Sequence, residues 1–197
     1  VPDGLADVER FEQGEFVQVL TNEIRTALGD EFTQLPMVTV VGDVKHAALV
    51  EDVLEREKPN VVFHAAAYKH VPLMEETNAW QAVRNNAYGT WVIARASVAA
   101  KVEKFVLVST DKAVNPTSVM GASKRLAEIV CQTLQGGGTA FVVVRFGNVF
   151  GSAGSVIPRF REQIARGGPV TVTHPDITRY FMSLSEATQL LLQAALQ

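Results

Sequence analysis

Short runs of β-branched and aromatic residues, each apolar throughout, constrain the fold of this chain more than any other feature. They lie at residues 37–41, 61–63, 105–108 and 141–144. Strands buried on both faces of a parallel sheet have this continuous pattern, whereas strands with one wet face alternate. Helical patterns separate the runs, at residues 16–28, 46–57, 77–100, 118–135 and 183–197. Strand and helix in alternation predict βαβ units, and therefore an α/β fold with one parallel sheet.

Local signals predict how several of these helices begin and which face they bury. Thr77 is the predicted N-cap of the long helix, and the spacing of Ser183 and Glu186 is that of a capping box. In the long helix we expect an apolar stripe that includes Trp80 and Trp91 to face the core. Asp43 has two open interpretations: an N-cap for the helix at 46–57, or a ligand contact in a strand-end loop.

Composition excludes several classes of protein. With 197 residues, 47% of them hydrophobic, the chain is long enough for one domain with a real core. There are 18 Lys plus Arg against 21 Asp plus Glu, a net charge of −3, which argues against nucleic acid as a partner. Cys131 is alone, so no internal disulfide forms, and a cytoplasmic location is expected. No run approaches the roughly 18 apolar residues of a membrane span.

Parallel sheets bind ligands beyond the carboxyl ends of their strands, so the residues after each run are the candidate site. The most informative are Thr110, Asp111 and Lys112, which follow the run at 105–108. A carboxyl group beside an amine can divide acid and base work between them. The ordinary alternative for an adjacent Asp-Lys pair is a surface ion pair.

Other candidates follow the same logic. Small residues at 65–67 would let a flat ligand lie against the backbone after the second run. Met120 and Lys124 are spaced i, i+4 and share one helix face, with a core filler and a solvated charge as the ordinary alternatives. The Gly- and Ser-rich segment 147–155 offers backbone amides to an anionic group, although it matches no standard phosphate-loop motif. The histidines lack metal-ligand spacing, so no metal is predicted.

Five strings of the sequence together resemble the extended short-chain dehydrogenase/reductase superfamily. They are HAAAYKHVPLMEE (64–76), NNAYGT (85–90), VEKFVLVSTDKAVNPTSVMGASKRLAE (102–128), RFGNVFGSAGSVIPRF (145–160) and GGPVTVTHPDITRYFMSLSEA (167–187). More narrowly, they resemble the CapD-like polysaccharide biosynthesis family of UDP-N-acetylglucosamine 4,6-dehydratases. The resemblance implies a tail at 1–14, a partial Rossmann-like NAD(P)-binding domain at 15–150 and part of a substrate-binding region at 151–197.

The resemblance also implies a mechanism. Lys112 would be the base that removes the C5 proton of the sugar, Asp111 the acid that protonates the departing C6 hydroxyl, and Thr110 a hydrogen-bond partner of the C4 oxygen. Lys124 matches the lysine of the superfamily's YxxxK motif, which holds the cofactor ribose. Met120 stands at the tyrosine position, as in a Met-for-Tyr subgroup, so the C4 proton would leave through Thr110 to Asp111.

The same resemblance assigns further contacts. The cofactor is NAD or NADP, tightly bound and recycled at each turnover; the substrate is a UDP-sugar, and the protein is expected to be a homo-oligomer. The implied cofactor contacts are Asp43, Val44, Ala65, Ala66, Lys69, Asn86, Ser109, Lys124 and Val149. The implied substrate contacts are Lys69, Asn148, Gly154, Ser155, Val156, Thr171, Thr173 and Arg179.

One departure from the family affects the expected activity. The family begins with a strand, a glycine-rich turn and a helix that bind the pyrophosphate, and no G-x-x-G-x-x-G turn occurs before residue 42. We therefore expect an N-terminally truncated sheet without the first phosphate-binding βαβ portion, and a chain that is inactive alone. Membrane helices in further upstream sequence would place the protein at the cytoplasmic face of the inner membrane. The alternatives are a nucleotide-sugar epimerase, including a dehydratase with C5 epimerisation, and a non-catalytic nucleotide-sugar-binding module.

Overall fold

The computed structural model describes residue 38 and residues 40–150, 156–172 and 174–197. The expected tail at 1–14 and the expected helix at 16–28 lie outside them. The described residues form two units, 40–147 with 190–197 and 148–189, and each is described by itself. Within the described ranges, no helix has the length and apolarity needed to cross a bilayer.

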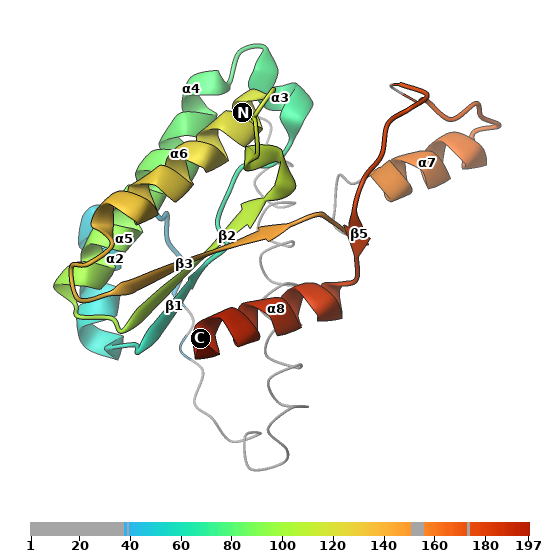
Figure 1. Cartoon of the computed structure of the whole chain (residues 1–197). Coiled ribbons are helices and arrows are strands. Elements are labelled where there is room, and N and C mark those ends of the chain that lie inside the picture. Colours follow the sequence, from blue (N-terminus) through green and yellow to red (C-terminus); the bar gives the residue numbers. More distant parts are fainter. Residues whose placement is uncertain (1–37, 39, 151–155, 173) are drawn as a thin grey trace. The chain divides into compact units, whose positions relative to one another are not determined.

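A parallel three-stranded sheet forms the centre of the first unit (Figure 1). Its strands are β1 (Val61–His64), β2 (Lys104–Thr110) and β3 (Ala140–Phe146), in the order β1-β2-β3. Phe105 lies between Val62 and Phe141 in the ladder. The predicted α/β class is confirmed, because three of the four apolar runs become adjacent parallel strands.

Helices complete the βαβ units of the first unit. They are α2 (Ala47–Glu57), α3 (Val71–Glu75), α4 (Ala79–Ala82), the π-helix η2 (Val83–Tyr88), α5 (Gly89–Ala99), the 3-10 turn η3 (Asp111–Ala113) and α6 (Val119–Leu134). Helices α5 and α6 cover one face of the sheet (Figure 1). There Phe105 and Leu107 of β2 are fully buried against Ala94, Ala127 and Cys131. Burying each of the two large side chains contributes about 1.5–3 kcal/mol to stability.

The second unit contains two short parallel strands, the helix that follows the first of them and the first residues of the helix that follows the second. Strand β4 (Asn148–Val149) pairs with β5 (Phe181–Met182), and the rings of Phe150 and Phe181 stack with centroids 5.0 Å apart. Helix α7 (Val156–Ala165) follows β4, and α8 (Leu184–Leu196) follows β5. The predicted capping box is confirmed: the Glu186 amide donates to Ser183 Oγ at 3.1 Å, and the Ser183 amide donates to Glu186 Oε2 at 2.6 Å.

Two local predictions are wrong. The described residues of the run at 37–41 (Val38, Val40 and Val41) form no strand and are exposed. A strand needs a hydrogen-bonded neighbour, and none of the described strands pairs with this run. Helix α4 begins after Asn78 rather than Thr77, and the Asn78 side chain donates to the Leu73 carbonyl at 2.8 Å.

The predicted buried stripe of the long helix is wrong at its two tryptophans. Trp80 and Trp91 are 67% and 38% exposed, whereas Ala94 of the same stripe is buried, together with Asn86 and Thr90. For Trp91 the π-helix η2 is the physical reason, because its wider turn shifts the side chains that follow it away from the face that a 3.6-residue period predicts. Small and polar side chains therefore lie inside, and each polar one needs a partner there.

Candidate functional site

Thr110, Asp111 and Lys112 lie together at the carboxyl end of β2. Thr110 is the last strand residue, and Asp111 begins the turn η3. The Thr110 hydroxyl and the Lys112 ammonium both donate to Asp111 Oδ1, at 3.0 and 2.9 Å. The Asp111 and Lys112 side chains are 30% and 33% exposed, so the pair is neither in the core nor fully solvated. The structure thus brings a hydroxyl and an amine onto one oxygen atom of the acid.

The protonation state of Asp111 follows from these contacts. Partial burial acts to raise the pKa of its carboxyl, but the hydrogen bonds from Lys112 and Thr110 and the Lys112 charge outweigh it and hold the pKa below its ordinary value. The carboxylate is therefore ionised at neutral pH. To act as an acid, Asp111 must first take up a proton, and Lys112 is the nearest donor to it among the contacts described.

Gly121 allows the Lys112 backbone in this turn to lie close to the first turn of α6. A Cβ atom at Gly121 would lie 2.3 Å from the Lys112 carbonyl oxygen, which is a backbone atom. The helix begins at Ser118, whose hydroxyl accepts a hydrogen bond from the Gly121 amide at 3.1 Å. Only glycine allows the start of α6 and the turn to approach this closely.

We expect Gly121→Ala to lower the free energy of unfolding by about 1–3 kcal/mol, because the turn must move away from the helix. Urea denaturation followed by circular dichroism measures this loss. Ala122→Ser, at the exposed neighbouring position, is the matched control and should change the free energy by less than about 0.5 kcal/mol. Equal stabilities of Gly121→Ala and the unsubstituted chain would contradict the close approach.

Lys124 and Met120 lie in α6 beside this turn. The Lys124 side chain is buried, and among the described residues its ammonium makes no hydrogen bond. Burial lowers the pKa of Lys124 to about 8, although Cys131 and Glu128 act in the opposite direction. Lys124 is therefore no solvated charge. Met120 is buried with Met74 and Ala82, which matches the core-filling interpretation of this methionine.

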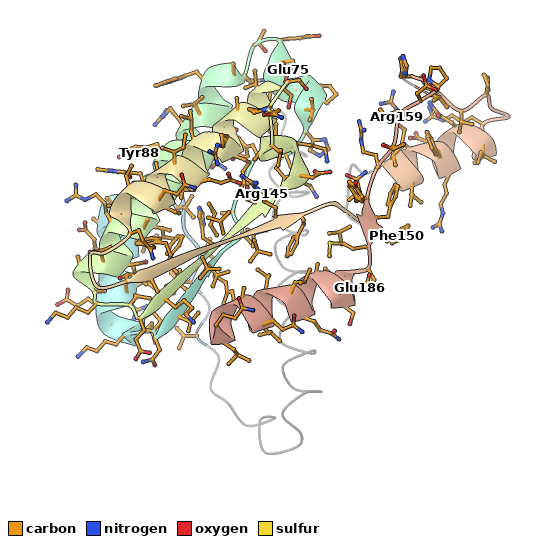
Figure 2. The ribbon with its side chains drawn as sticks, viewed as in Figure 1. Glu75, Tyr88, Arg145, Phe150, Arg159 and Glu186 are labelled. Atoms are coloured by element: carbon orange, nitrogen blue, oxygen red, sulfur yellow. The ribbon has the colours of Figure 1, made fainter. Side chains whose placement is uncertain are left out.

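A buried carboxylate that the sequence analysis did not find, Glu128, lies one turn beyond Lys124. Glu128 Oε1 accepts hydrogen bonds from Ser109 Oγ at 2.6 Å and from Arg145 Nε at 2.8 Å, and Oε2 accepts from Arg145 Nη2 at 2.6 Å and Arg125 Nη1 at 2.8 Å. Figure 2 shows the Arg145 side chain reaching from β3 toward α6. Burial acts to raise the pKa of Glu128, but these donors outweigh it and lower the pKa to about 2.

This network joins β2, β3 and α6, and it includes Ser109, the residue directly before Thr110. Ser109, one of the predicted cofactor contacts, is buried, and its hydroxyl donates to Glu128. This hydrogen bond holds the end of β2 on α6. The i, i+4 spacing of Lys124 and Glu128 was the available signal in the sequence, since it places both on one helix face.

Asn86 occupies a similar supporting place on η2. It is fully buried; its side-chain oxygen accepts from the Tyr68 amide at 2.7 Å, and its nitrogen donates to the Tyr68 carbonyl and to Ser123 Oγ, both at 2.9 Å. Asn86 is one of the predicted cofactor contacts, and its hydrogen bonds join the loop after β1 to α6.

The same chain of hydrogen bonds fixes the tautomer of His64. Thr90 donates its hydroxyl hydrogen to the Asn86 carbonyl at 2.6 Å, so at 2.9 Å it accepts from His64 Nε2. Burial, together with the Lys124 charge, lowers the pKa of His64 to about 3, so the ring is neutral. Its Nδ1 atom is buried and has no partner among the described residues.

The turn after the first apolar run holds Asp43 and Val44. The N-cap of α2 is His46, so the N-cap interpretation of Asp43 is wrong. Asp43 Oδ1 instead accepts from the Lys45 amide at 2.8 Å, and its side chain is 55% exposed. Val44 packs on α5, where a Cβ at Gly89 would lie 2.9 Å from Val44 Cγ2.

Small residues follow β1, as predicted. Ala65 is exposed and Ala66 is half-buried, so a ligand can reach the backbone at the carboxyl end of this strand. Lys69 is exposed in the same loop. Since β1 and β2 are adjacent and parallel, this loop and the Thr110 cluster lie at the same edge of the sheet.

The remaining predicted contacts belong to the second unit or lie outside the described residues. Asn148 and Val149 form β4, and Val156 begins α7. The Thr171 hydroxyl accepts from Gln163 Nε2 at 3.0 Å, and Arg179 Nη1 donates to the Thr178 carbonyl at 2.8 Å. Gly154, Ser155 and Thr173 lie outside the described residues.

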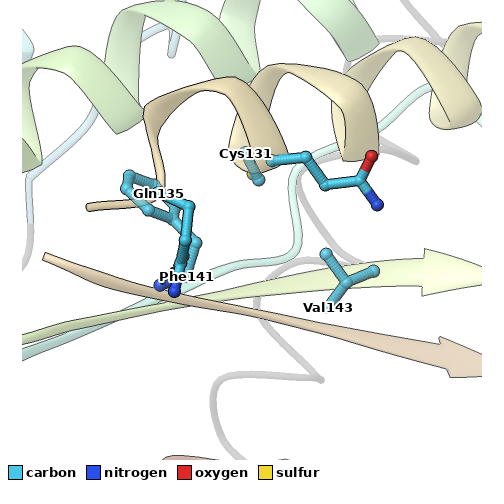
Figure 3. A pocket seen from close by; sticks show the side chains of 5 residues that line it. Cys131, Gln135, Phe141 and Val143 are labelled. Carbon is cyan, nitrogen blue, oxygen red and sulfur yellow. Dashed lines mark hydrogen bonds between the residues drawn. The ribbon is translucent and has the colours of Figure 1, made fainter. Parts of the chain in front are cut away.

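A pocket in the first unit lies away from these groups. It has a volume of about 180 Å³ and is lined by Cys131, Gln132, Gln135, Phe141 and Val143 (Figure 3). These residues come from the C-terminal half of α6, from its C-cap Gln135 and from the first half of β3. They are therefore at the opposite end of the sheet from Thr110–Lys112, and the pocket is not part of the candidate site.

The parallel sheet with flanking helices is a fold that this chain shares with solved nucleotide-sugar enzymes. It matches, for example, part of the Thermus thermophilus UDP-glucose 4-epimerase complex with NAD, with a TM-score of 0.70 and 23% identity over 79% of this chain and 59% of that one. The family described as "Polysaccharide biosynthesis protein" matches residues 5–197, and the chain belongs to that family. The match begins ahead of residue 15, where we expected the resemblance to start.

Two relatives show how much of a longer protein the chain represents. It is 55% identical over 163 residues to the capsular polysaccharide biosynthesis protein CapD of Staphylococcus aureus, covering 82% of this chain and 27% of CapD. It is 40% identical over 158 residues to the UDP-glucose 4-epimerase of Rickettsia rickettsii, covering 78% of this chain and 46% of that enzyme. The chain therefore spans about a quarter to a half of the length of these relatives.

Proposed function

We propose that the chain carries the catalytic part of a nucleotide-sugar 4,6-dehydratase that converts UDP-N-acetylglucosamine to a 4-keto-6-deoxy sugar nucleotide for polysaccharide biosynthesis. The observation that carries this proposal is the convergence of Thr110 and Lys112 on Asp111 Oδ1. Dehydration needs a base for the C5 proton and an acid for the C6 hydroxyl. Such a pair, held in one ion pair, suits that need.

The residues present fit a nicotinamide dinucleotide. Lys124 is a buried ammonium with no hydrogen bond among the described residues, so it has donors to offer to ribose hydroxyls. Ala65 leaves the backbone after β1 open, and Asp43 presents a half-exposed carboxylate to an adenine amino group. When bound, the dinucleotide would supply a hydride acceptor for C4 and return the hydride at C6.

The chain's own residues then move the protons. Lys112 in its neutral form takes the C5 proton, which a C4 ketone has made acidic. Asp111 in its protonated form gives its proton to the leaving C6 hydroxyl, which departs as water. Starting from the observed ion pair, Asp111 gains the C4 hydroxyl proton and Lys112 releases its own proton to solvent, which gives this reactive pair. After water has left, Lys112 returns the C5 proton, and it regains its own proton from solvent. Thr110, whose hydroxyl donates to Asp111 Oδ1 at 3.0 Å, would hydrogen-bond the C4 oxygen and relay its proton to Asp111.

We expect Lys112→Met and Asp111→Asn each to lower turnover about 100- to 10,000-fold, the range typical of a lost acid or base. The assay measures 4-keto-6-deoxy product from UDP-N-acetylglucosamine with NAD or NADP, in the intact enzyme that contains these residues. Thr133→Val, whose hydroxyl only donates to the Val130 carbonyl on an exposed part of α6, is the control and should leave turnover unchanged. Normal turnover by Asp111→Asn would overturn both of its acid roles.

A nucleotide-sugar epimerase is the second candidate, favoured by the 40% identity to the Rickettsia UDP-glucose 4-epimerase. Proton NMR of the product separates the two reactions. A dehydratase creates a C6 methyl group, and in D₂O deuterium enters at C5, whereas a 4-epimerase keeps the C6 hydroxymethyl group. UDP-sugar binding with no deuterium incorporation would instead favour a non-catalytic binding module.

A further inference from the structure

A lysine outside the catalytic cluster, Lys45, joins the Asp43 turn to the buried network of the first unit. Its ammonium lies 2.9 Å from Asp43 Oδ2 and donates to Asn85 Oδ1 at 3.0 Å. It also lies 5.8 Å from the centre of the Tyr68 ring, within the range of a cation–π contact. The Lys45 side chain is only 18% exposed, so these contacts are partly shielded from water.

The contacts of Lys45 continue into the buried network. Asn85 is buried, and its side-chain nitrogen donates to Asn86 Oδ1 at 3.3 Å. Asn86 in turn holds the Tyr68 backbone and Ser123, the residue directly before Lys124. One continuous series of contacts therefore runs from Asp43 to the helix that carries Lys124. These residues belong to one unit of the structure.

We propose that Lys45 is a positioning residue for the adenosine end of the cofactor site, because it bridges Asp43 and Asn85 and so holds the Asp43 turn on η2. This inference rests on the proposed function, in which the Asp43 carboxylate receives the adenine. Lys45 does not touch the reacting sugar. It determines where the Asp43 oxygens lie.

Two further observations support this role. Asp43 accepts twice from Lys45, from its amide at Oδ1 and from its ammonium at Oδ2, so one residue orients the whole carboxylate. Partial burial acts to raise the pKa of Asp43, but Lys45, with a smaller contribution from the Arg84 charge, holds the pKa below its ordinary value and keeps the carboxylate ionised. The contact between Val44 and Gly89 leaves no room for the turn to move closer to the helix.

The test compares ADP and UDP binding to the intact enzyme that contains these residues and to its Lys45→Met variant, by following backbone amides in NMR titrations. Methionine keeps the length of the side chain and removes its charge. We expect Lys45→Met to bind ADP about tenfold more weakly and to leave UDP binding unchanged, because only the adenosine end depends on the Asp43 turn. Lys45→Arg can reach both Asp43 and Asn85, and should restore ADP affinity to within about threefold.

Arg56→Met is the matched control, since Arg56 pairs only with Asp52 and Glu57 on the exposed side of α2. It should bind both nucleotides as the unsubstituted chain does. Equal ADP affinity in Lys45→Met, or a parallel loss of ADP and UDP binding with a lower melting temperature, would overturn the positioning role alone. If ADP does not shift the amides of residues 43–45 in the unsubstituted chain, the adenosine assignment of Asp43 fails, and the role of Lys45 fails with it.

Discussion

Glu128→Gln is expected to lower the free energy of unfolding by about 2–4 kcal/mol at pH 7. The Glu128 side chain is 1% exposed and accepts four hydrogen bonds from Ser109, Arg125 and Arg145. A glutamine offers one acceptor oxygen, and its amide group would face a guanidinium as a second donor. Removing one partner of a buried ion pair costs about 3–5 kcal/mol, and the partial exposure of both arginines reduces that value here.

The stabilisation by Glu128 should depend on pH, and the direction follows from its lowered pKa. The pKa of Glu128 falls from an ordinary 4.5 to about 2 in the folded chain, so its carboxylate stabilises the fold above about pH 4.5 and this contribution is lost as pH falls toward 2. The difference between the unsubstituted chain and Glu128→Gln should therefore shrink over that interval. Urea denaturation at several pH values measures it.

Glu55→Gln is the control for this substitution, because Glu55 is exposed on α2. Its effect should stay within about 0.5 kcal/mol at every pH. A loss below 1 kcal/mol for Glu128→Gln at pH 7 would contradict the view that this network holds the end of β2 in place.

The opposite sign is expected for Lys124→Met, which should raise the free energy of unfolding at pH 7 by up to about 3 kcal/mol and abolish dinucleotide binding. Burial lowers the pKa of Lys124 from 10.5 to about 8, so the folded chain holds its proton less tightly than the unfolded chain. A shift of this size corresponds to about 3 kcal/mol lost at neutral pH. Methionine has a similar length and no charge to bury.

The gain should be largest below about pH 8 and should shrink as pH rises to about 10.5, where the lysine is neutral in both states. Thermal unfolding at pH 7 and pH 10 measures this change, and calorimetry with NAD and NADP measures binding in the enzyme that contains these residues. Lys101→Met, at an exposed position, is the control and should change neither quantity. If Lys124→Met destabilises the chain at pH 7, the ammonium has a stabilising partner and the predicted cost of burying it is wrong. A group kept at a cost to stability is typical of a functional site.

Much of the fold was predictable because its signals are local. A strand buried on both faces needs an apolar side chain at every position, so the runs at 61–63, 105–108 and 141–144 could be recognised without their neighbours. The starts of α6 and α8 were equally readable, since Ser118 and Ser183 cap helices through contacts within three residues. The run at 37–41 had the same composition but no neighbouring strand among those described.

The candidate site was predictable only in part. Position after a strand was enough to select Thr110, Asp111 and Lys112, because the carboxyl ends of parallel strands meet at one edge. The convergence of Thr110 and Lys112 on Asp111 Oδ1 depends on side-chain rotamers, which residue spacing does not predict. The exposure of Trp91 depends on η2, because one wider turn shifts every later side chain around the helix axis.

By itself, the sequence determined the alternation of strands and helices, the parallel sheet and the edge where polar groups gather, since each depends on residues a few positions apart. Only the tertiary structure decided that Ser109 and Asn86 support the site from inside, that Lys124 is buried, and that Lys45 bridges Asp43 and Asn85. These roles depend on which side chains meet across elements far apart in the chain. Hydrogen bonding and desolvation depend on the distances between side chains in space, and the order of residues in the chain does not give those distances directly.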